Sequence, residues 1–131
     1  MGERISIQFH NPDSGMAPSV AFFDHWGGPV RLLDDALDYV QELNSERDAR
    51  DANDVMYPLD RREPNTIMID FIRWIALKRL DLYDRITSGW YLGVDGMDGD
   101  NSDWGHHIID ARTGHQIDPM DLINHRRESN G

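Results

Sequence analysis

The chain of 131 residues contains no cysteine. This absence excludes disulfide bonds, thiolate zinc sites and cysteine nucleophiles. Long apolar runs are also missing, since no segment approaches the ~18 consecutive apolar residues of a membrane span. The charged start MGERISIQF lacks the apolar stretch of a signal peptide. We therefore expect a cytoplasmic protein that does not associate with a membrane.

Lysine and glutamate are scarce as well. Lys78 is the single lysine beside 12 arginines, and only 5 glutamates accompany 19 aspartates, for a formal net charge of −11. Short hydrated carboxylates, with few long lysine stems, suit a surface in concentrated salt that screens self-repulsion. This composition favours a salt-accumulating host, archaeal or viral. The alternative is an acidic mimic of nucleic acid; direct binding to DNA or RNA is not expected, because no basic stripe is present.

Apolar patterns predict both strands and helices. Period-2 alternation in RISIQF predicts a half-buried strand over 4–9, and further strands are predicted over 19–26, 90–94, 106–111 and, shortest, 115–117. Apolar residues at helical spacing predict helices over 30–50 and from Pro64 or Asn65 to Lys78. A polar connector over 48–63 separates the two helical patterns.

This order predicts the fold class and domain organisation. We expect a single α+β domain over 1–131, in which 121–131 form a frayed tail. Its sheet should be antiparallel and four- to five-stranded, in ββααββ order, with two helices packed on one face. A free edge of such a sheet would invite a homodimer.

The segment DGMDGDNSDWGHH, residues 95–107, is the most chemically suggestive. Its spacing fails the EF-hand test, because counting from Asp98 puts Asp103 where glycine is required and Ile109 where glutamate is required. We favour a solvated hairpin tip in which Gly and Asp make local turns, and we predict no cofactor. A non-EF calcium site is the alternative, with these candidate ligands: Asp95, Asp98, Asp100 and Asp103.

A second candidate is FFDHWGG, at the end of the second predicted strand. Asp24 and His25 could form a general-base pair, because histidine titrates near neutrality and a carboxylate can orient it. The interpretation that we favour is a strand end that Trp26 caps and two glycines turn. His107 is a further catalytic candidate.

His106 and His107 open the fourth predicted strand and should point to opposite faces of the sheet. A metal-dependent hydrolase could recruit His25, one of these two histidines and Asp103, since catalytic zinc takes three N or O ligands. No helical HExxH or similar spacing supports this alternative. We therefore lean toward a protein that is not an enzyme.

Three stretches together resemble a group of small prokaryotic and viral proteins to which no activity is assigned. They are SVAFFDHWGG, YPLDRREPNTIMIDFIRW and YLGVDGMDGDNSDWGHHIID. The shared elements are an HWGG-type strand end, a Pro-Asn helix start and an Asp- and Gly-rich hairpin leading into HHIID. The resemblance spans most of the chain from Ile5 to Asp110. It implies a small domain with a viral or mobile-element connection, and it names no catalytic residue.

These features favour a small non-enzymatic protein that binds an unknown protein partner. Tryptophan is enriched at interaction hot spots, and hairpin topology would bring the end of the second strand next to the loop before the fourth. The expected surface combines Asp98, Asp100, Asp103 and His25 with these candidate binding residues: Asp24, Trp26, Trp104 and His106.

Overall fold

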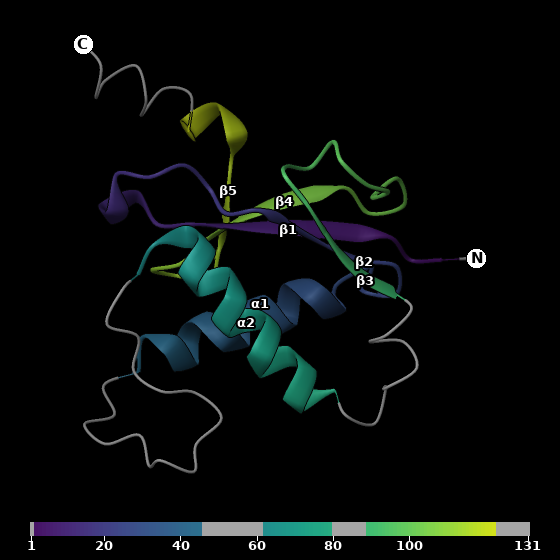
Figure 1. Cartoon of the computed structure of the whole chain (residues 1–131), viewed down its shortest axis with the longest axis horizontal. Coiled ribbons are helices and arrows are strands. Elements are labelled where there is room, and N and C mark those ends of the chain that lie inside the picture. The colour runs from purple at the N-terminus through teal and green to yellow at the C-terminus, as the bar shows by residue number, and fades with distance from the viewer. Residues whose placement is uncertain (1, 46–61, 80–88, 123–131) are drawn as a thin grey trace.

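The computed structural model describes residues 2–45, 62–79 and 89–122 (Figure 1). The α+β class is confirmed. The observed order includes a short 3-10 helix between the first two strands, and the short fifth strand expected over 115–117 lies at Gln116–Ile117. The elements are β1 (Ile5–His10), η1 (Pro12–Ser14), β2 (Ala21–Asp24), α1 (Arg31–Leu43), α2 (Pro64–Lys78), β3 (Trp90–Gly93), β4 (His106–Asp110) and β5 (Gln116–Ile117). Most of the expected connector over 48–63, and the expected tail beyond Leu122, lie outside the described residues.

The strands form one mixed sheet in the order β3-β2-β1-β4-β5. The expected antiparallel hairpin of β1 and β2 is confirmed, and β3 and β5 pair antiparallel with β2 and β4. β1 and β4 are parallel, with Ser6 opposite His106 and His10 opposite Asp110. The prediction of a purely antiparallel sheet is therefore wrong. The hairpin expected between β3 and β4 does not form, because β2 and β1 lie between these strands.

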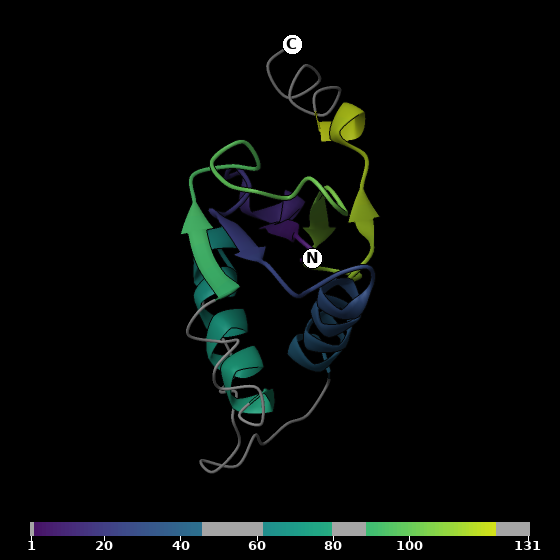
Figure 2. The same cartoon turned by 90° about the vertical axis from the view of Figure 1, so that its right-hand side faces the viewer.

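Both helices cover the same face of the sheet (Figure 2). Ile5, Ile7 and Phe9 of β1 are fully buried in the core on this side. Phe71 of α2 packs against Phe9 and Phe22, with ring centroids 5.1 and 5.8 Å apart. Complete burial of such side chains contributes about 1.5–3 kcal/mol each, so this aromatic and aliphatic cluster is the main source of stability.

Polar contacts fix the two helices relative to each other. The buried Tyr39 hydroxyl of α1 donates a hydrogen bond to Asp70 Oδ2 of α2 at 2.8 Å. The guanidinium of Arg79, just after α2, pairs with the buried Asp35 of α1 at 2.6 Å. None of the helices that the structure describes combines the length and the apolar character needed to cross a bilayer.

The connection between β3 and β4, residues 94–105, crosses the face of the sheet that the helices leave open (Figure 2). We call it the covering loop. Gly99 rests on the stacked rings of Phe23 and Tyr91, where a Cβ would lie 2.7 Å from atoms of both rings. Asn101 Nδ2 donates to Ser6 Oγ of β1 at 2.8 Å. This segment is therefore not the tip of a hairpin, although most of its residues are exposed, as expected of a solvated segment.

With helices on one face and the covering loop on the other, β1 is buried along its whole length. The expectation of a half-buried strand fails at its polar positions, since Ser6 is 0% and Gln8 9% exposed. Both side chains find hydrogen-bond partners, as buried polar groups must. Gln8 Nε2 donates to the carbonyl oxygen of Ser19 at 2.7 Å, and Ser6 Oγ contacts His106 Nδ1 at 2.6 Å.

Candidate functional site

The candidate site lies where β2 ends and the covering loop approaches β4. Here a shallow open hollow of about 760 Å³ is lined by three segments that are far apart in the sequence. We call it the sheet-end surface. Three residues of the expected surface, His25, Asp103 and Trp104, line this hollow. The other expected residues are not among its lining residues: Asp24, Trp26, Asp98, Asp100 and His106. Its lining residues are Gly2, Glu3, Arg4, His25, Asp103 and Trp104.

Arg4 connects the start of β1 to the covering loop. Its backbone N–H and its Nε both donate to Asp103 Oδ2, at 3.1 and 2.8 Å. Its Nη1 donates to Asp100 Oδ2 at 2.5 Å. Side-chain and backbone hydrogen bonds from Arg4 lower the pKa of Asp103 to about 2, so this carboxylate is ionised at neutral pH. One arginine thereby anchors two of the aspartates considered as calcium ligands.

Trp104 is held in place although its side chain is 46% exposed. Its N–H donates to the carbonyl oxygen of Arg4 at 3.0 Å, and its own carbonyl oxygen lies 2.8 Å from His107 Nε2. The indole ring lies against Gly28, where a Cβ would come within 2.1 Å of Trp104 Cδ1. Gly28 of the HWGG element is therefore required by close packing within the chain itself.

His25, directly after β2, is a further lining residue of the hollow and is held by several contacts. Its ring makes an edge contact with Trp26, with centroids 4.4 Å apart, and it covers Gly2, where a Cβ would lie 2.4 Å from Nε2. Its carbonyl oxygen accepts from the N–H of Glu3 at 2.8 Å, and its own N–H donates to the carbonyl oxygen of Gly89 at 2.9 Å. His25 is thus held within the lining of the sheet-end surface, whereas Trp26 is not among the lining residues.

Asp24 takes no part in this surface, because its side chain is 1% exposed and turned into the protein. Oδ1 accepts from the N–H of Trp26 at 2.9 Å, and Oδ2 accepts from Arg31 Nη2 at 3.1 Å. Burial raises the pKa of Asp24 above its usual value, although these hydrogen bonds and charges oppose the shift. Asp24 therefore braces the start of α1, and no described contact lets it orient His25 as a general base.

The remaining aspartates of the covering loop bond to the loop's own backbone. Asp95 Oδ1 accepts from the N–H of Met97 at 2.8 Å, and Asp98 Oδ2 accepts from the N–H of Val94 at 2.7 Å. The N–H and hydroxyl of Ser102 lower the pKa of Asp100, with a further contribution from Arg4. Asp95 and Asp100 thereby make Asx turns, whereas Asp98 bonds back to a residue four positions earlier. In the described ranges, no three His, Asp or Glu side chains are grouped to hold a metal ion.

The two adjacent histidines lie apart from His25. His106 contacts Ser6 Oγ at 2.6 Å and Gln8 Oε1 at 2.7 Å under the covering loop. His107 Nδ1 contacts Gln116 Oε1 at 2.7 Å. The structure therefore does not bring together the set proposed for a metal-dependent hydrolase. The Ser6–His106 pair has the separation of a nucleophile and its base, but Ser6 is 0% exposed and no substrate reaches it.

Sequence reasoning missed the contribution of the N-terminal segment. Arg4 and Asp103 are 99 positions apart, and nothing local in either stretch indicates that they pair. The available signal was charge: Arg4 is the one basic residue before β1, in a chain where aspartate outnumbers arginine. Such a guanidinium has many carboxylates available as partners in this chain, but which of them it meets depends on the crossing of the covering loop.

Comparison with protein-family models, with curated proteins and with solved structures found no match to this chain. The membership suggested by the HWGG and HHIID elements therefore stays a prediction. Function has to be inferred from the geometry of the site itself.

Proposed function

We propose that this protein is a small non-enzymatic binding protein that engages a protein partner through the sheet-end surface. The observation that supports this most directly is Trp104, which is half-exposed and yet held by backbone contacts and by Gly28. A side chain that is already fixed loses little conformational freedom on binding, so the entropic cost of burying it is small. Tryptophan is among the residue types most enriched at hot spots, which cluster near the centre of an interface.

The charges around Trp104 indicate what the partner must offer. Arg4 already pairs with Asp100 and Asp103, so the hollow keeps an acidic excess to which Glu3 adds. A complementary partner carries a pocket for the indole ring, bordered by basic side chains. With a net charge of −11 on the whole chain, association with such a partner should be accelerated at low salt and slowed as salt screens the attraction.

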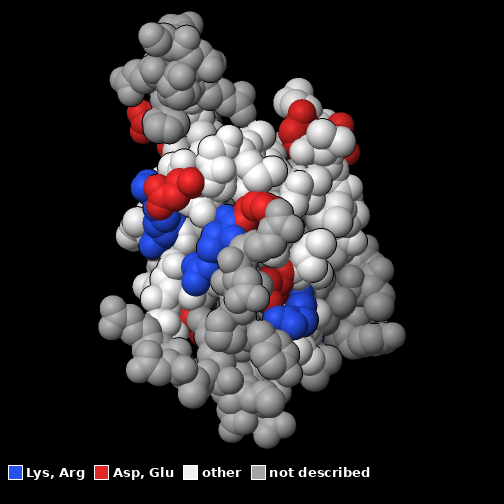
Figure 3. Space-filling view, turned by 60° about the vertical axis from the view of Figure 1, so that its left-hand side comes forward, with Lys and Arg blue, Asp and Glu red and all other residues white. Residues whose placement is uncertain are grey.

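Neither alternative gains an observation in its favour. The hydrolase would need His25, Asp103 and His106 or His107 in one cluster. His25 and Asp103 line the same hollow, but His106 and His107 lie outside its lining and contact Gln8 and Gln116. The nucleic-acid mimic would need carboxylates in rows. On the face drawn in Figure 3, acidic groups alternate with Lys and Arg instead of forming a continuous band.

Affinity purification from the source organism tests the proposal, with the tagged wild-type protein and two tagged variants as bait. We expect wild type and Met97→Ala to retain the same partner and Trp104→Ala to lose it. Met97 is the matched control because it is 90% exposed on the covering loop but lies outside the hollow. With the purified partner, calorimetry should show a loss of about 2 kcal/mol or more for Trp104→Ala, roughly 30-fold in affinity.

A second variant protects this test from a folding artefact. His25→Ala leaves Trp104 in place but removes another side chain that lines the hollow, and we expect it to weaken the same complex. Circular dichroism melts identify any variant that fails to fold. A partner retained equally by Trp104→Ala and His25→Ala, with both variants folded, would contradict the proposal.

A further inference from the structure

β3 is the last strand at one end of the sheet, so one of its edges pairs with β2 and the other pairs with no strand that the structure describes. Just before β3, the N–H of His25 donates to the carbonyl oxygen of Gly89 at 2.9 Å. Because bonded and non-bonded positions alternate along an antiparallel pair, the backbone of Tyr91 also faces β2. The N–H and C=O groups of Trp90 and Leu92 therefore point outward, which makes this edge a template for a further strand.

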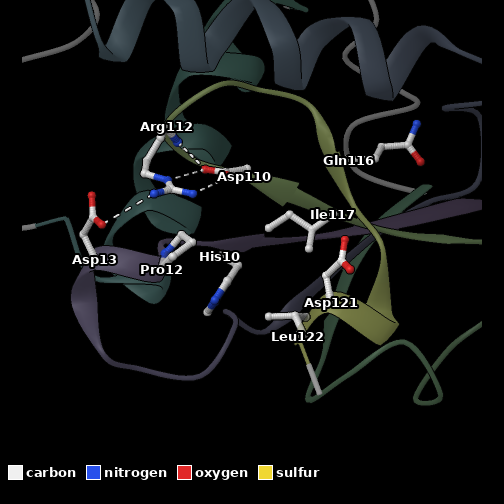
Figure 4. Close-up of a pocket in the computed structure, with 9 residues that line it drawn as sticks. All are labelled: His10, Pro12, Asp13, Asp110, Arg112, Gln116, Ile117, Asp121 and Leu122. Carbon is white, nitrogen blue, oxygen red and sulfur yellow. Dashed lines mark hydrogen bonds and ion pairs between the residues drawn. The ribbon is translucent and has the colours of Figure 1, made fainter. Parts of the chain in front are cut away.

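The two ends of the sheet differ in how their outer edges are protected. β5, at the other end, has only two residues, and Pro119 follows shortly after it. The charged side chains of Arg112 and Asp121 lie beside β5 in the pocket drawn in Figure 4. Short length, charge and proline are features by which natural proteins keep sheet edges from pairing. The stretch WYLGV, residues 90–94, has neither a charge nor a proline, so β3 lacks this protection.

Exposed apolar side chains accompany the outer edge of β3. Leu92 is 54% and Val94 74% exposed. Leu92 lies on the face of the sheet that the helices cover, because it is paired with Phe22, whose ring packs against Phe71 of α2. Val94, two positions further on, belongs to the same face. Large apolar side chains next to outward-pointing backbone groups together indicate an edge that another strand covers.

The apolar surface continues from β3 onto α2, which lies beneath the same end of the sheet, whereas α1 lies beneath the other (Figure 2). Asp70 of α2 faces α1, since it accepts a hydrogen bond from Tyr39. At ~100° per residue, Ile72 is turned to the other side of α2. Ile69, one turn before Ile72, is 71% exposed. A chain that extends the sheet at β3 would therefore also find apolar surface on α2.

We propose that β3 pairs antiparallel with β3 of a second copy of this chain, so that two sheets join into one. A strand is the occupant that outward-pointing N–H and C=O groups require, and a second copy supplies one without charge. In the register centred on Leu92, the two Leu92 residues exchange backbone hydrogen bonds across a twofold axis. Val94 of each copy then lies opposite Trp90 of the other, and the exposed apolar side chains cover one another.

Two further observations fit this register. The N–H of Val94 donates to Asp98 Oδ2 at 2.7 Å, which ends the pairing segment at Val94 in both copies alike. Tyr91 of each copy comes opposite Gly93 of the other, and an aromatic ring across from an edge glycine stabilises a sheet. None of these residues lines the hollow of the sheet-end surface, so this proposal does not depend on the function proposed for that surface.

Sedimentation of the full-length protein over a range of concentrations tests the dimer. We expect the mass to double as the concentration rises, and to do so more readily in ~1 M KCl, where a Debye length of ~3 Å screens the repulsion between two acidic copies. Leu92→Lys sets like charges opposite each other and should raise the dissociation constant about tenfold or more. Met120→Lys is the matched control, because it makes a similar change at a 60% exposed side chain beyond β5.

Single cysteines test the register, because the natural chain has none. Opposed residues of a bonded pair have Cα atoms ~5.5 Å apart, within the reach of a disulfide, so mild oxidation should link Leu92→Cys into a covalent dimer. Val94→Cys is the control at a more exposed position. Its two copies would lie ~14 Å apart along the strands and should stay unlinked.

Circular dichroism melts identify a lysine variant that fails to fold, and the cysteine variants, which add no charge, then decide the question. Three results would each overturn the proposal. They are a chain that stays monomeric at every concentration and salt, which would leave the edge to a strand of another protein, equal weakening by the two lysine variants, and equal linking of the two cysteine variants.

Discussion

The hydrogen bonds around His106 determine where its proton lies. Gln8 Nε2 donates to the carbonyl oxygen of Ser19, so Gln8 Oε1 faces His106 Nε2 and must accept the imidazole proton. His106 Nδ1 is then an acceptor for the Ser6 hydroxyl, and Ser6 Oγ in turn accepts from Asn101 Nδ2. Protonation of Nδ1 would put two donors face to face unless the Ser6 hydroxyl rotated away. The network therefore favours the neutral imidazole.

This network predicts a pH-dependent stability. Burial, together with the charge of His107, lowers the pKa of His106 below its usual value near 6.5. At a pH between the pKa of His106 in the folded chain and its pKa in the unfolded chain, only the unfolded chain binds the proton. The free energy of unfolding therefore falls as the pH drops below about 6.5. It should be constant above that pH, as far as this group is concerned. Urea denaturation from pH 7.5 to pH 5 measures the slope.

The matched pair of variants for this test is His106→Gln and His115→Gln. We expect His106→Gln to flatten the slope between pH 6.5 and pH 5, and His115→Gln, which removes an exposed imidazole, to leave it unchanged. An identical slope in wild type and His106→Gln would show that the imidazole titrates alike in the folded and unfolded chains.

At this same scale, sequence reasoning identified the reactive residue types but not their surroundings. The sequence allows the aspartates at 95, 98 and 100 to be calcium ligands or to make local turns in a solvated segment. Their oxygens accept hydrogen bonds from the loop backbone, as the second interpretation expects, and Asp100 also accepts from Arg4, which neither interpretation includes. Short carboxylates serve all three purposes equally well. The choice depends on which donors the fold brings close, and that information is not local.

At the scale of elements, the strands and helices themselves were predictable from local periodicity. The RISIQF alternation and the helical spacing of apolar residues over 64–78 both give elements near the expected positions. The pairing of β4 was not predictable. Twelve residues over 94–105 can reach ~40 Å when extended, and three strand spacings amount to only ~15 Å. Chain length therefore permits a crossing as readily as a hairpin, and the Gly- and Asp-rich composition suits both.

Contact between the covering loop and the sheet can be tested at Gly99. The backbone of Gly99 is not in the left-handed region, so Gly99→Ala adds a methyl group without adding backbone strain. That methyl would meet Phe23 and Tyr91 at 2.7 Å. Because such overpacking costs about 1–3 kcal/mol, we expect a lower urea midpoint and faster amide exchange in the covering loop.

Met97→Ala is the control for this experiment, since it changes the same loop at a side chain that is 90% exposed. Its urea midpoint should match that of wild type. If Gly99→Ala also left the midpoint unchanged, the covering loop would not rest on the two rings in solution.

At the scale of the whole molecule, aspartate and arginine are used as pairs. Asp35, Asp70 and Asp24 are buried, and each accepts from an arginine. Part of the aspartate excess is therefore structural and does not form the hydrated surface that the composition suggested. Exposed carboxylates such as Asp34 and Asp38 remain for that role, and Figure 3 shows both kinds of charge close together on one face.

Salt acts on these two populations in opposite directions. Screening weakens exposed ion pairs such as those of Arg4 with Asp100 and Asp103, whereas it relieves the repulsion of a chain with a net charge of −11. Exposed pairs contribute about 0–1 kcal/mol each, and the buried pairs respond little to salt. Relief of repulsion should therefore dominate, and the melting temperature should rise as KCl is added.

The concentration range of this rise distinguishes simple screening from adaptation to concentrated salt. The Debye length is already ~10 Å at 0.1 M and ~3 Å at 1 M, so screening alone saturates below molar salt. Because we propose that the exposed aspartates serve a salt-accumulating host, we expect the melting temperature to keep rising from 1 to 3 M KCl. Calorimetric melts across this range, with Asp34→Asn and Asp38→Asn combined as a variant of lower charge, measure it. If the melting temperature stopped rising below 1 M KCl, screening of charge repulsion would explain the whole rise. The salt dependence would then give no support to a saline environment.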